Sequence, residues 1–411
     1  MASLGSADVD SITDLLRRLV ATPSRAGEDD PATIFALLRG WLGERGLPCE
    51  DVVDEDGRVV AITGVADGAE GAPVYYLNAT VDTAGYGDPA AWQSAPWIPT
   101  ERGGRLYGRG TADSKAGVAI FCHVFERLRA PPPGLPCRLG FVFDAEEHSG
   151  RFLGMRRFLA LRRHPIAGVM IGYPGLDRLV TGARGFLRAT IRLHGEGAHS
   201  GSSQGHGVNA LVKAAELVRR LAALNEDFAA DAESAFPLPP KLTVTRLGGG
   251  GEFSLVPDQA EIDVDFRLTP AFERGSAEAL LRQALESADS ALPGRAPAEL
   301  VIHQSLPAYL LPSDSPLALA LGEAGGRILG RRLPTGPCGP SNVGNLLATH
   351  GIAATCGFGV SASGLHAPNE WIELATVPPV FDTYVEAARR LVGEAVGEVR
   401  WPAERERKSF A

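Results

Sequence analysis

Three short apolar runs, each followed by polar side chains, most constrain the fold of this chain. They span Pro73 to Val81, Arg138 to Glu147 and Ala167 to Gly175. Each has the length of a strand and an almost continuous apolar character, as in strands buried on both faces of a sheet. A helix pattern, Ser114 to Leu128, lies between the first two and stops before a proline cluster. This order predicts an α/β domain with a mixed, mostly parallel sheet flanked by helices.

The pattern changes after about Arg184. Strands with one polar face now alternate with amphipathic helices in the order strand, helix, strand, strand, helix. This order predicts a small α+β insertion with a ferredoxin-like arrangement. After about Leu300 the sequence again shows the continuous apolar pattern of strands that are buried on both faces. We therefore predict a catalytic α/β domain at residues 1–183 and 300–411, interrupted by an inserted domain at residues 184–299.

Composition excludes several classes of protein. A chain of 411 residues is long enough for two domains. Its net charge of −9 argues against nucleic acid as a partner. No run of 18 uncharged apolar residues occurs, and the N-terminus does not resemble a secretory signal, so we expect no membrane span and a cytoplasmic location. The five scattered cysteines indicate neither a disulfide framework nor a thiolate zinc site.

Polar side chains gather just after the predicted strands and before the predicted helix. Because carboxyl ends of parallel strands meet at one edge of an α/β sheet, residues far apart in sequence can converge there. Carboxylates and imidazole are the ligands of divalent metals such as zinc. The candidates are Asp82, Asp113, Glu146, Glu147, Tyr173 and His366.

The chain resembles the zinc aminoacylase and exopeptidase family that includes acetylornithine deacetylase, succinyl-diaminopimelate desuccinylase and glutamate carboxypeptidase. The resemblance extends over nearly the whole length. It is carried, in order, by LLRRLVATPS, GDPAAWQSAPWIPTERGGRLYGRGTADSKAG, DAEEHSG, GEGAHSG, DVDFRLTP and LHAPNE. One motif alone would be weak, but the full series in this order implies the family's fold.

The resemblance implies a two-metal site in which one of the two metal positions has lost its own ligands. The family's two zinc ions share an aspartate, which falls on Asp113, and one ion also takes the equivalents of Glu147 and His366. The other ion takes a histidine and an acid whose positions hold Thr80 and Tyr173. We therefore predict one zinc, or another divalent ion, per chain and a lost second metal position. In that family Asp82 orients the missing histidine.

The resemblance also implies roles around the metal. Glu146 occupies the place of the general base, and His199 that of a histidine that stabilises the oxyanion in the partner subunit. Arg267 matches a residue that holds a substrate carboxylate, and Gly359 matches backbone close to substrate. Asn342 replaces an acid near the substrate surface.

Plainer interpretations stand beside these. Asp113 can be a helix cap, His366 a core histidine and Arg267 a solvated arginine. Thr80 and Tyr173 can fill the vacated metal position by hydrogen bonding, to Asp82 or to substrate. His148 or His206 can supply the missing imidazole if its loop turns inward; the sequence alone does not favour this.

Three functions follow as hypotheses. The leading one is a metal-dependent amidohydrolase that cleaves an N-acyl or peptide bond next to a carboxylate in a small amino-acid derivative or short peptide. The second is a repurposed family member that catalyses acyl transfer, condensation or cyclisation, with little or no metal. The third is a non-catalytic binding protein. Because the insertion pairs chains in relatives, the resemblance also implies a homodimer.

Overall fold

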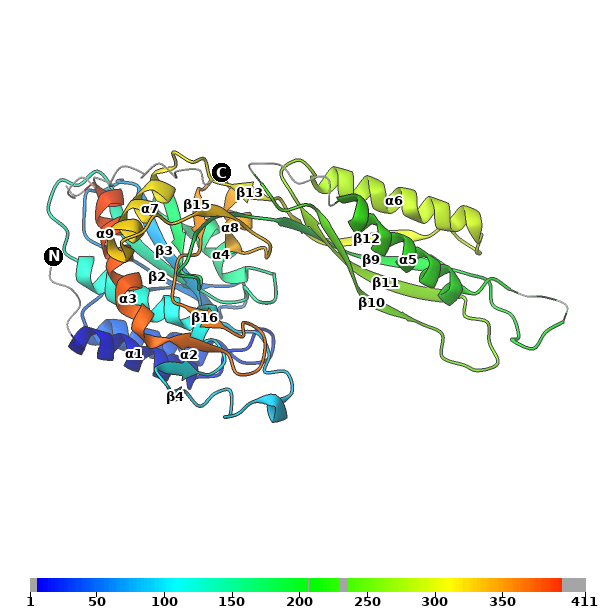
Figure 1. Cartoon of the computed structure of the whole chain (residues 1–411), viewed down its shortest axis with the longest axis horizontal. Coiled ribbons are helices and arrows are strands. Elements are labelled where there is room, and N and C mark those ends of the chain that lie inside the picture. Colours follow the sequence, from blue (N-terminus) through cyan, green and yellow to red (C-terminus); the bar gives the residue numbers. More distant parts are fainter. Residues whose placement is uncertain (1–5, 204, 206, 229–235, 394–411) are drawn as a thin grey trace, which may run out of the picture. The chain divides into compact units, whose positions relative to one another are not determined.

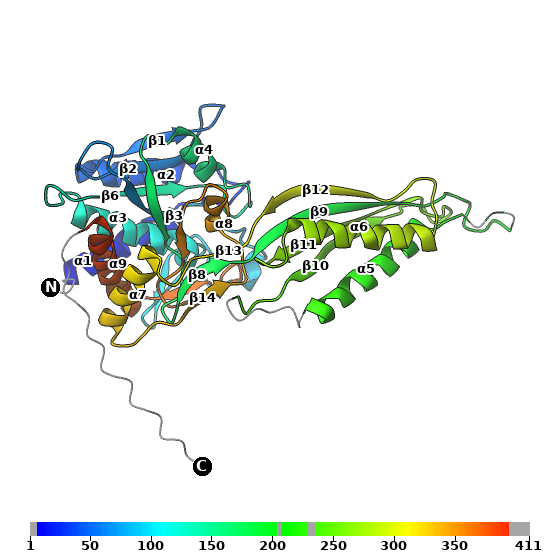
Figure 2. The same cartoon turned by 90° about the horizontal axis from the view of Figure 1, so that it is seen from above.

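A computed structural model describes residues 6–203, 205, 207–228 and 236–393, which form two compact units (Figures 1 and 2). The first unit takes its residues from 1–179, 312–334 and 357–411. The second takes them from 180–311 and 335–356. The second unit thus includes residues 335–356, which lie outside the insertion that we predicted at residues 184–299.

The sheet of the first unit places the strands that precede the candidate site side by side. The first unit contributes five strands to it, β1 (Glu50–Val53), β2 (Val59–Val65), β6 (Arg138–Asp144), β3 (Val74–Thr80) and β7 (Ile166–Ile171), in that order across the sheet. β2 is antiparallel to both β1 and β6, whereas β3 is parallel to both β6 and β7. The sheet is therefore mixed, and its three predicted buried strands are adjacent.

Helices flank this sheet. They are α1 (Ser6–Val20), α2 (Ala32–Glu44), α3 (Ala116–Leu128), α4 (Leu153–Leu161), α7 (Pro316–Leu329) and α9 (Val377–Val392). α3 and α9 pack against β3 and β6, and α4 packs against β1, β2 and β6. At Gly117 of α3, an added Cβ would lie 2.5 Å from the carbonyl oxygen of Gly172, so only glycine allows this close approach. Among the described helices, none is long and apolar enough to span a bilayer.

A small antiparallel sheet connects distant parts of the first unit. Its strands are β4 (Thr100–Arg102), β5 (Arg105–Tyr107), β16 (Ala362–Ser363) and β17 (Trp371–Glu373), in the order β16-β17-β5-β4. In the pairing of β17 with β5, Trp371 lies opposite Tyr107 and Glu373 opposite Arg105. This pairing brings the segment with His366 next to the loop that leads to Asp113.

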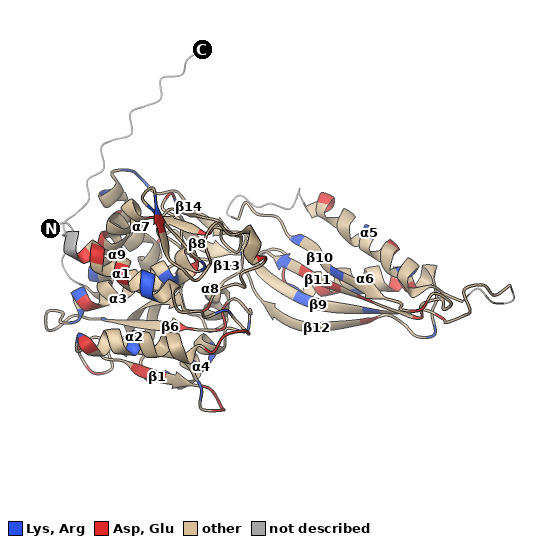
Figure 3. Cartoon of the chain, turned by 90° about the horizontal axis from the view of Figure 1, so that it is seen from below, with Lys and Arg blue, Asp and Glu red and all other residues tan. Residues whose placement is uncertain are grey.

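The second unit contains an antiparallel sheet with one charged face. Its main elements follow the order β9 (Gly185–His194), α5 (Ala210–Phe228), β10 (Lys241–Gly249), β11 (Gln259–Leu268), α6 (Arg274–Ala291) and β12 (Glu299–Leu306). The sheet order is β10-β11-β9-β12. Alternate residues of β11, from Ala260 to Leu268, join a core with apolar residues of α5 and α6, while the residues between them carry charges (Figure 3). The order strand, helix, strand, strand, helix agrees with the α+β order predicted for this part of the chain.

Shorter elements complete the second unit. They are β8 (Leu179–Ala183), β13 (Tyr309–Leu310), β14 (Thr335–Cys338), α8 (Val343–Ala348) and β15 (Ala354–Cys356). β13, β8 and β14 form a three-stranded sheet in that order. Asn342 begins α8 as its N-cap, because its side-chain oxygen accepts a hydrogen bond from the backbone N–H of Gly344 at 2.8 Å.

The buried imidazole of His123 in α3 makes the first unit sensitive to acid. It contacts the Ser11 hydroxyl at 2.9 Å and the Ala119 carbonyl at 2.8 Å, and burial lowers the pKa of His123 from 6.5 to about 4. The folded state therefore favours the neutral ring. Its contribution to stability is complete above pH 6.5 and is lost as the pH falls towards 4.

We expect His123→Gln to reduce this acid sensitivity. Between pH 7 and pH 5, the variant should lose about 2 kcal/mol less of its free energy of unfolding than the unchanged protein. Tryptophan fluorescence during urea unfolding checks this, because every described tryptophan belongs to the first unit. EDTA in all samples removes any contribution from metal release. Equal losses in the two proteins would contradict the expectation.

Candidate metal centre

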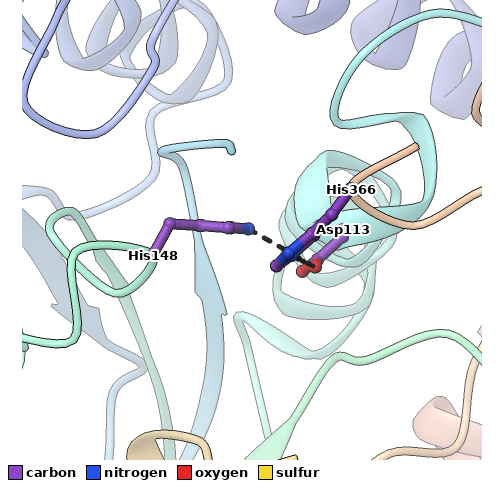
Figure 4. A group of neighbouring side chains, drawn as sticks. All are labelled: Asp113, His148 and His366. Atoms are coloured by element: carbon purple, nitrogen blue, oxygen red, sulfur yellow. Dashed lines mark hydrogen bonds and ion pairs between the residues drawn. The ribbon is translucent and has the colours of Figure 1, made fainter. Parts of the chain in front are cut away.

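Asp113 lies at the centre of a group of three side chains from separate segments. Its Oδ2 atom is 3.0 Å from Nε2 of His366 and 3.4 Å from Nε2 of His148. The three ligand atoms all lie within 4.8 Å of one another, and Figure 4 shows the side chains converging. Asp113 is 2% exposed, whereas His366 is largely open to solvent. The structure thus brings two of the predicted ligands together with a histidine considered only as an alternative.

Glu370 holds the loop that carries Asp113. Its carboxylate accepts hydrogen bonds from the backbone N–H groups of Gly110 at 3.0 Å, Ala112 at 2.8 Å and Asp113 at 3.1 Å. It also forms a buried ion pair with Arg109 at 2.7 Å. Since Glu370 follows His366 by four residues, one carboxylate fixes both ligand segments to each other. The sequence interpretation missed Glu370, although it lies within the quoted motif LHAPNE.

Asp82 occupies a buried position beside this group. Its carboxylate accepts a hydrogen bond from the Thr80 hydroxyl, which also donates to the Asp144 carbonyl at 3.0 Å. The backbone N–H groups of Glu147 and His148 donate to it at 3.2 Å and 3.0 Å. Thr80 thus bonds to Asp82, one of the two partners that the sequence left open. Burial raises the pKa of Asp82, but the nearby His148 outweighs burial and lowers it.

The two adjacent glutamates follow β6. Glu147 lies next to the group of three, with Oε2 3.6 Å from Nδ1 of His148, and its side chain is 12% exposed. Burial raises the pKa of Glu147 to about 8, and the charge of Asp113 adds to this while that of His148 opposes it. Glu146 has a left-handed backbone with φ of 67°, as does His366 with φ of 59°. Such strained residues cluster at functional sites.

Tyr173 and Gly359 lie against each other beside Asp113. The Tyr173 hydroxyl donates to Asp113 Oδ2 at 3.3 Å. A Cβ at Gly359 would lie 2.2 Å from the carbonyl oxygen of Tyr173, so close packing alone accounts for the glycine. Tyr173 therefore contacts Asp113 directly, at the oxygen that His148 and His366 also approach.

The other predicted residues belong to the second unit. His199 is exposed, and its Nδ1 atom accepts a hydrogen bond from the Gly201 backbone at 3.1 Å. Arg267 pairs with Asp265 at 2.7 Å and donates to the Ser341 hydroxyl at 3.0 Å. Asn342 is buried as a helix cap, which explains its side chain without substrate. Their roles in binding and catalysis stay predictions, and His206 lies outside the described residues.

Comparison with known proteins identifies the family. Residues 76–390 match peptidase family M20/M25/M40. The chain belongs to this family. It is 26% identical to an acetylornithine deacetylase from Yersinia pestis over 93% of this chain and 96% of that protein. It is 30% identical to a succinyl-diaminopimelate desuccinylase from Stenotrophomonas maltophilia (strain K279a) over 67% of this chain and 73% of that protein.

Solved structures of M20 proteins share the fold. An M20 family metallo-carboxypeptidase from Sulfolobus solfataricus has a TM-score of 0.76 at 18% identity, covering 92% of this chain and 99% of its own. A dinuclear metal-binding peptidase of the M20 family from Bacillus subtilis has a TM-score of 0.68 at 18% identity, covering 95% and 100%. The α/β fold with its insertion is therefore that of an M20 protein.

The residues present fit a divalent metal ion. One carboxylate and two imidazoles offer oxygen and nitrogen ligands from three directions, a donor set typical of zinc. Within the described part of the chain, both ring nitrogens of buried His148 lack a hydrogen-bonding partner. A buried polar atom without a partner is costly, and a ligand can satisfy it. Although burial raises the pKa of Asp113, the neighbouring His148 and His366 lower it well below its usual range.

We expect Glu370→Gln to loosen the metal centre. The substitution leaves buried Arg109 without its counter-charge, which should lower the free energy of unfolding of the first unit by about 3 kcal/mol. It should also weaken zinc binding about 10-fold or more, since the Asp113 loop loses its anchor. Urea unfolding and zinc competition with a chromophoric chelator measure the two effects. Glu373→Gln, an exposed neighbour, is the control, and equal behaviour of both variants would contradict the expectation.

Proposed function

We propose that this protein is a metal-dependent amidohydrolase that cleaves an N-acyl or peptide bond next to a carboxylate. The observation that carries the proposal is the convergence of Asp113, His148 and His366 in a chain of the M20 family. The two relatives described above are named for deacylation of acetylornithine and of succinyl-diaminopimelate. An acylated amino acid or a short peptide is therefore the proposed substrate class.

The proposed chemistry assigns a separate task to each polar group. Asp113, His148 and His366 would hold a divalent ion, which would supply Lewis acidity at the scissile carbonyl. Glu146 accepts a proton from the attacking water and delivers it to the leaving amine. His199 stabilises the oxyanion that forms when water attacks the scissile carbonyl. As the family resemblance implies, it does so in the active site of the partner subunit. Because its Nδ1 accepts a backbone hydrogen bond, the neutral ring carries its proton on Nε2, which is then a donor.

Two arginines of the second unit are proposed to recognise the substrate carboxylate. Ser341 lies between them, because its hydroxyl accepts a hydrogen bond from Arg267 at 3.0 Å and donates one to the Arg184 carbonyl at 2.7 Å. Burial lowers the pKa of Arg184, and the positive charge of Arg267 adds to this. In the described residues, Nε of Arg184 is buried without a hydrogen-bonding partner. Asp265 neutralises part of this charge through Arg267. A planar anion suits the remaining donors.

The comparisons support this proposal over the other hypotheses. The named relatives are hydrolases, which favours hydrolysis over acyl transfer, condensation or cyclisation and over binding alone. One zinc per chain, with Glu147 as a further ligand beside Asp113 and His366, stays a prediction. A cytoplasmic location stays a prediction as well.

A Glu146→Gln variant tests the proposed chemistry. Gln cannot accept the water's proton, so turnover should fall at least 100-fold while metal content stays unchanged. Release of amine from a panel of N-acetyl and N-succinyl amino acids and dipeptides measures turnover, and elemental analysis measures metal. Glu55→Gln, which alters an exposed acid, should leave turnover unchanged. Equal turnover after removal of metal with EDTA, or no hydrolysis of the panel by the unchanged protein, would overturn the proposal.

We also propose that the second unit pairs two chains through β10 and α5. β10 is an edge strand, and edge strands can pair with another chain. Leu247 on β10 and Val212 on α5 are 46% and 57% exposed. Leu247→Glu with Val212→Glu should therefore convert a dimer into a monomer in light scattering. Leu319→Glu on α7, where the leucine is also 46% exposed, should not. A monomeric unchanged protein, or a dimeric double variant, would contradict this.

A further inference from the structure

The imidazole of His148 lies where the carboxylate of Asp82 can orient it. Nδ1 of His148 is 3.3 Å from Asp82 Oδ2, and Nε2 is 3.4 Å from Asp113 Oδ2. We propose that His148 is a relocated metal ligand, which replaces the histidine that is absent at Thr80 and takes Asp82 as its orienting carboxylate. This inference rests on the proposed function only in requiring that the protein binds a metal.

The strand arrangement explains how the relocation is possible. Thr80 ends β3, and it lies opposite Asp144, the last residue of the parallel strand β6. His148 follows Asp144 by four residues, so both positions belong to the same edge of the sheet. The turn after β6 is fixed there because the His148 backbone N–H donates to Asp82. A side chain in the turn after β6 can therefore reach the metal position as readily as one at the end of β3.

The replacement of histidine by threonine at position 80 keeps the carboxylate in place. The Thr80 hydroxyl donates to Asp82 Oδ1, which leaves Oδ2 facing His148. A neutral imidazole that donates from Nδ1 to this oxygen presents the lone pair of Nε2 towards Asp113. A histidine held by a carboxylate on one nitrogen and by metal on the other is the usual arrangement in metal sites.

The position of His148 favours ligation over a purely structural role. Its side chain is 4% exposed, and it lies between two buried carboxylates. Neither ring nitrogen has a hydrogen bond among the described residues, although both lie near oxygen atoms. The rings of His148 and His366 are 5.2 Å apart between centroids and approach Asp113 from different segments (Figure 4). An ion bound to Asp113 Oδ2 and the two Nε2 atoms would give Nε2 of His148 the partner that it lacks.

Metal binding by the purified protein tests the proposal without reference to activity. Metal-free protein should bind one Co²⁺ or Zn²⁺ ion per chain in competition with a chromophoric chelator. His148→Ala should weaken binding about 100-fold or more, and Asp82→Asn about 10–100-fold. Thr80→His combined with His148→Ala should restore most of the lost affinity, because the imidazole returns through the other strand. His350→Ala, an exposed histidine, should bind as the unchanged protein does.

A cysteine variant identifies the ligand directly. With Co²⁺ bound, His148→Cys should show a thiolate-to-cobalt charge-transfer band that the unchanged protein and His350→Cys lack. This readout keeps the proposal testable if His148→Ala does not fold. Unchanged affinity in His148→Ala, together with loss of binding in Asp113→Asn, would overturn the role of His148 but leave the proposed function standing. Absence of metal binding by the unchanged protein would overturn both.

Discussion

The candidate site depends on the buried carboxylate of Glu370. One oxygen pairs with Arg109, and both oxygens accept backbone N–H groups of the loop that ends at Asp113. Burial raises the pKa of Glu370, and its hydrogen bond with Gly110 and the charge of Arg109 oppose this. The loop and the His366 segment are far apart in sequence, so their approach rests on this carboxylate and on the pairing of β17 with β5. The positions of Asp113 and His366 are therefore fixed by Glu370, a residue that is not itself a predicted ligand.

Charge balance explains why so many acids can lie together at the end of the sheet. Asp82 and Asp113 are both nearly inaccessible, and each contacts the imidazole of His148. These carboxylates raise the pKa of His148 well above its ordinary value, against the effect of burial. Two negative charges that are buried near each other repel strongly, because the protein interior has low polarity. A cation beside both carboxylates, as imidazolium or as a bound metal ion, would reduce this repulsion.

The sequence predicted the architecture well because strand burial and helix periodicity are local signals. The adjacent buried strands, the one-sided sheet of the second unit and the place of Asp113 before α3 all follow from such patterns. The division of the chain was harder to predict, since residues 335–356 belong to the second unit through long-range contacts. Glu370 was missed because its partners are backbone groups about 260 residues away. No local pattern encodes such contacts.

The role of His148 shows where motif reasoning fails. A motif assigns a ligand to a position in the sequence, whereas a metal responds only to the positions of atoms. Thr80 ends β3, and His148 lies in the turn four residues after the end of the neighbouring parallel strand β6, so an imidazole can reach the same space from either strand. Loss of a histidine at one strand therefore does not imply loss of a ligand while Asp82 keeps its place. Tyr173 differs from His148 in this respect. Its neutral hydroxyl donates a hydrogen bond to Asp113, so it does not replace the charge of the acid that the family has at this position.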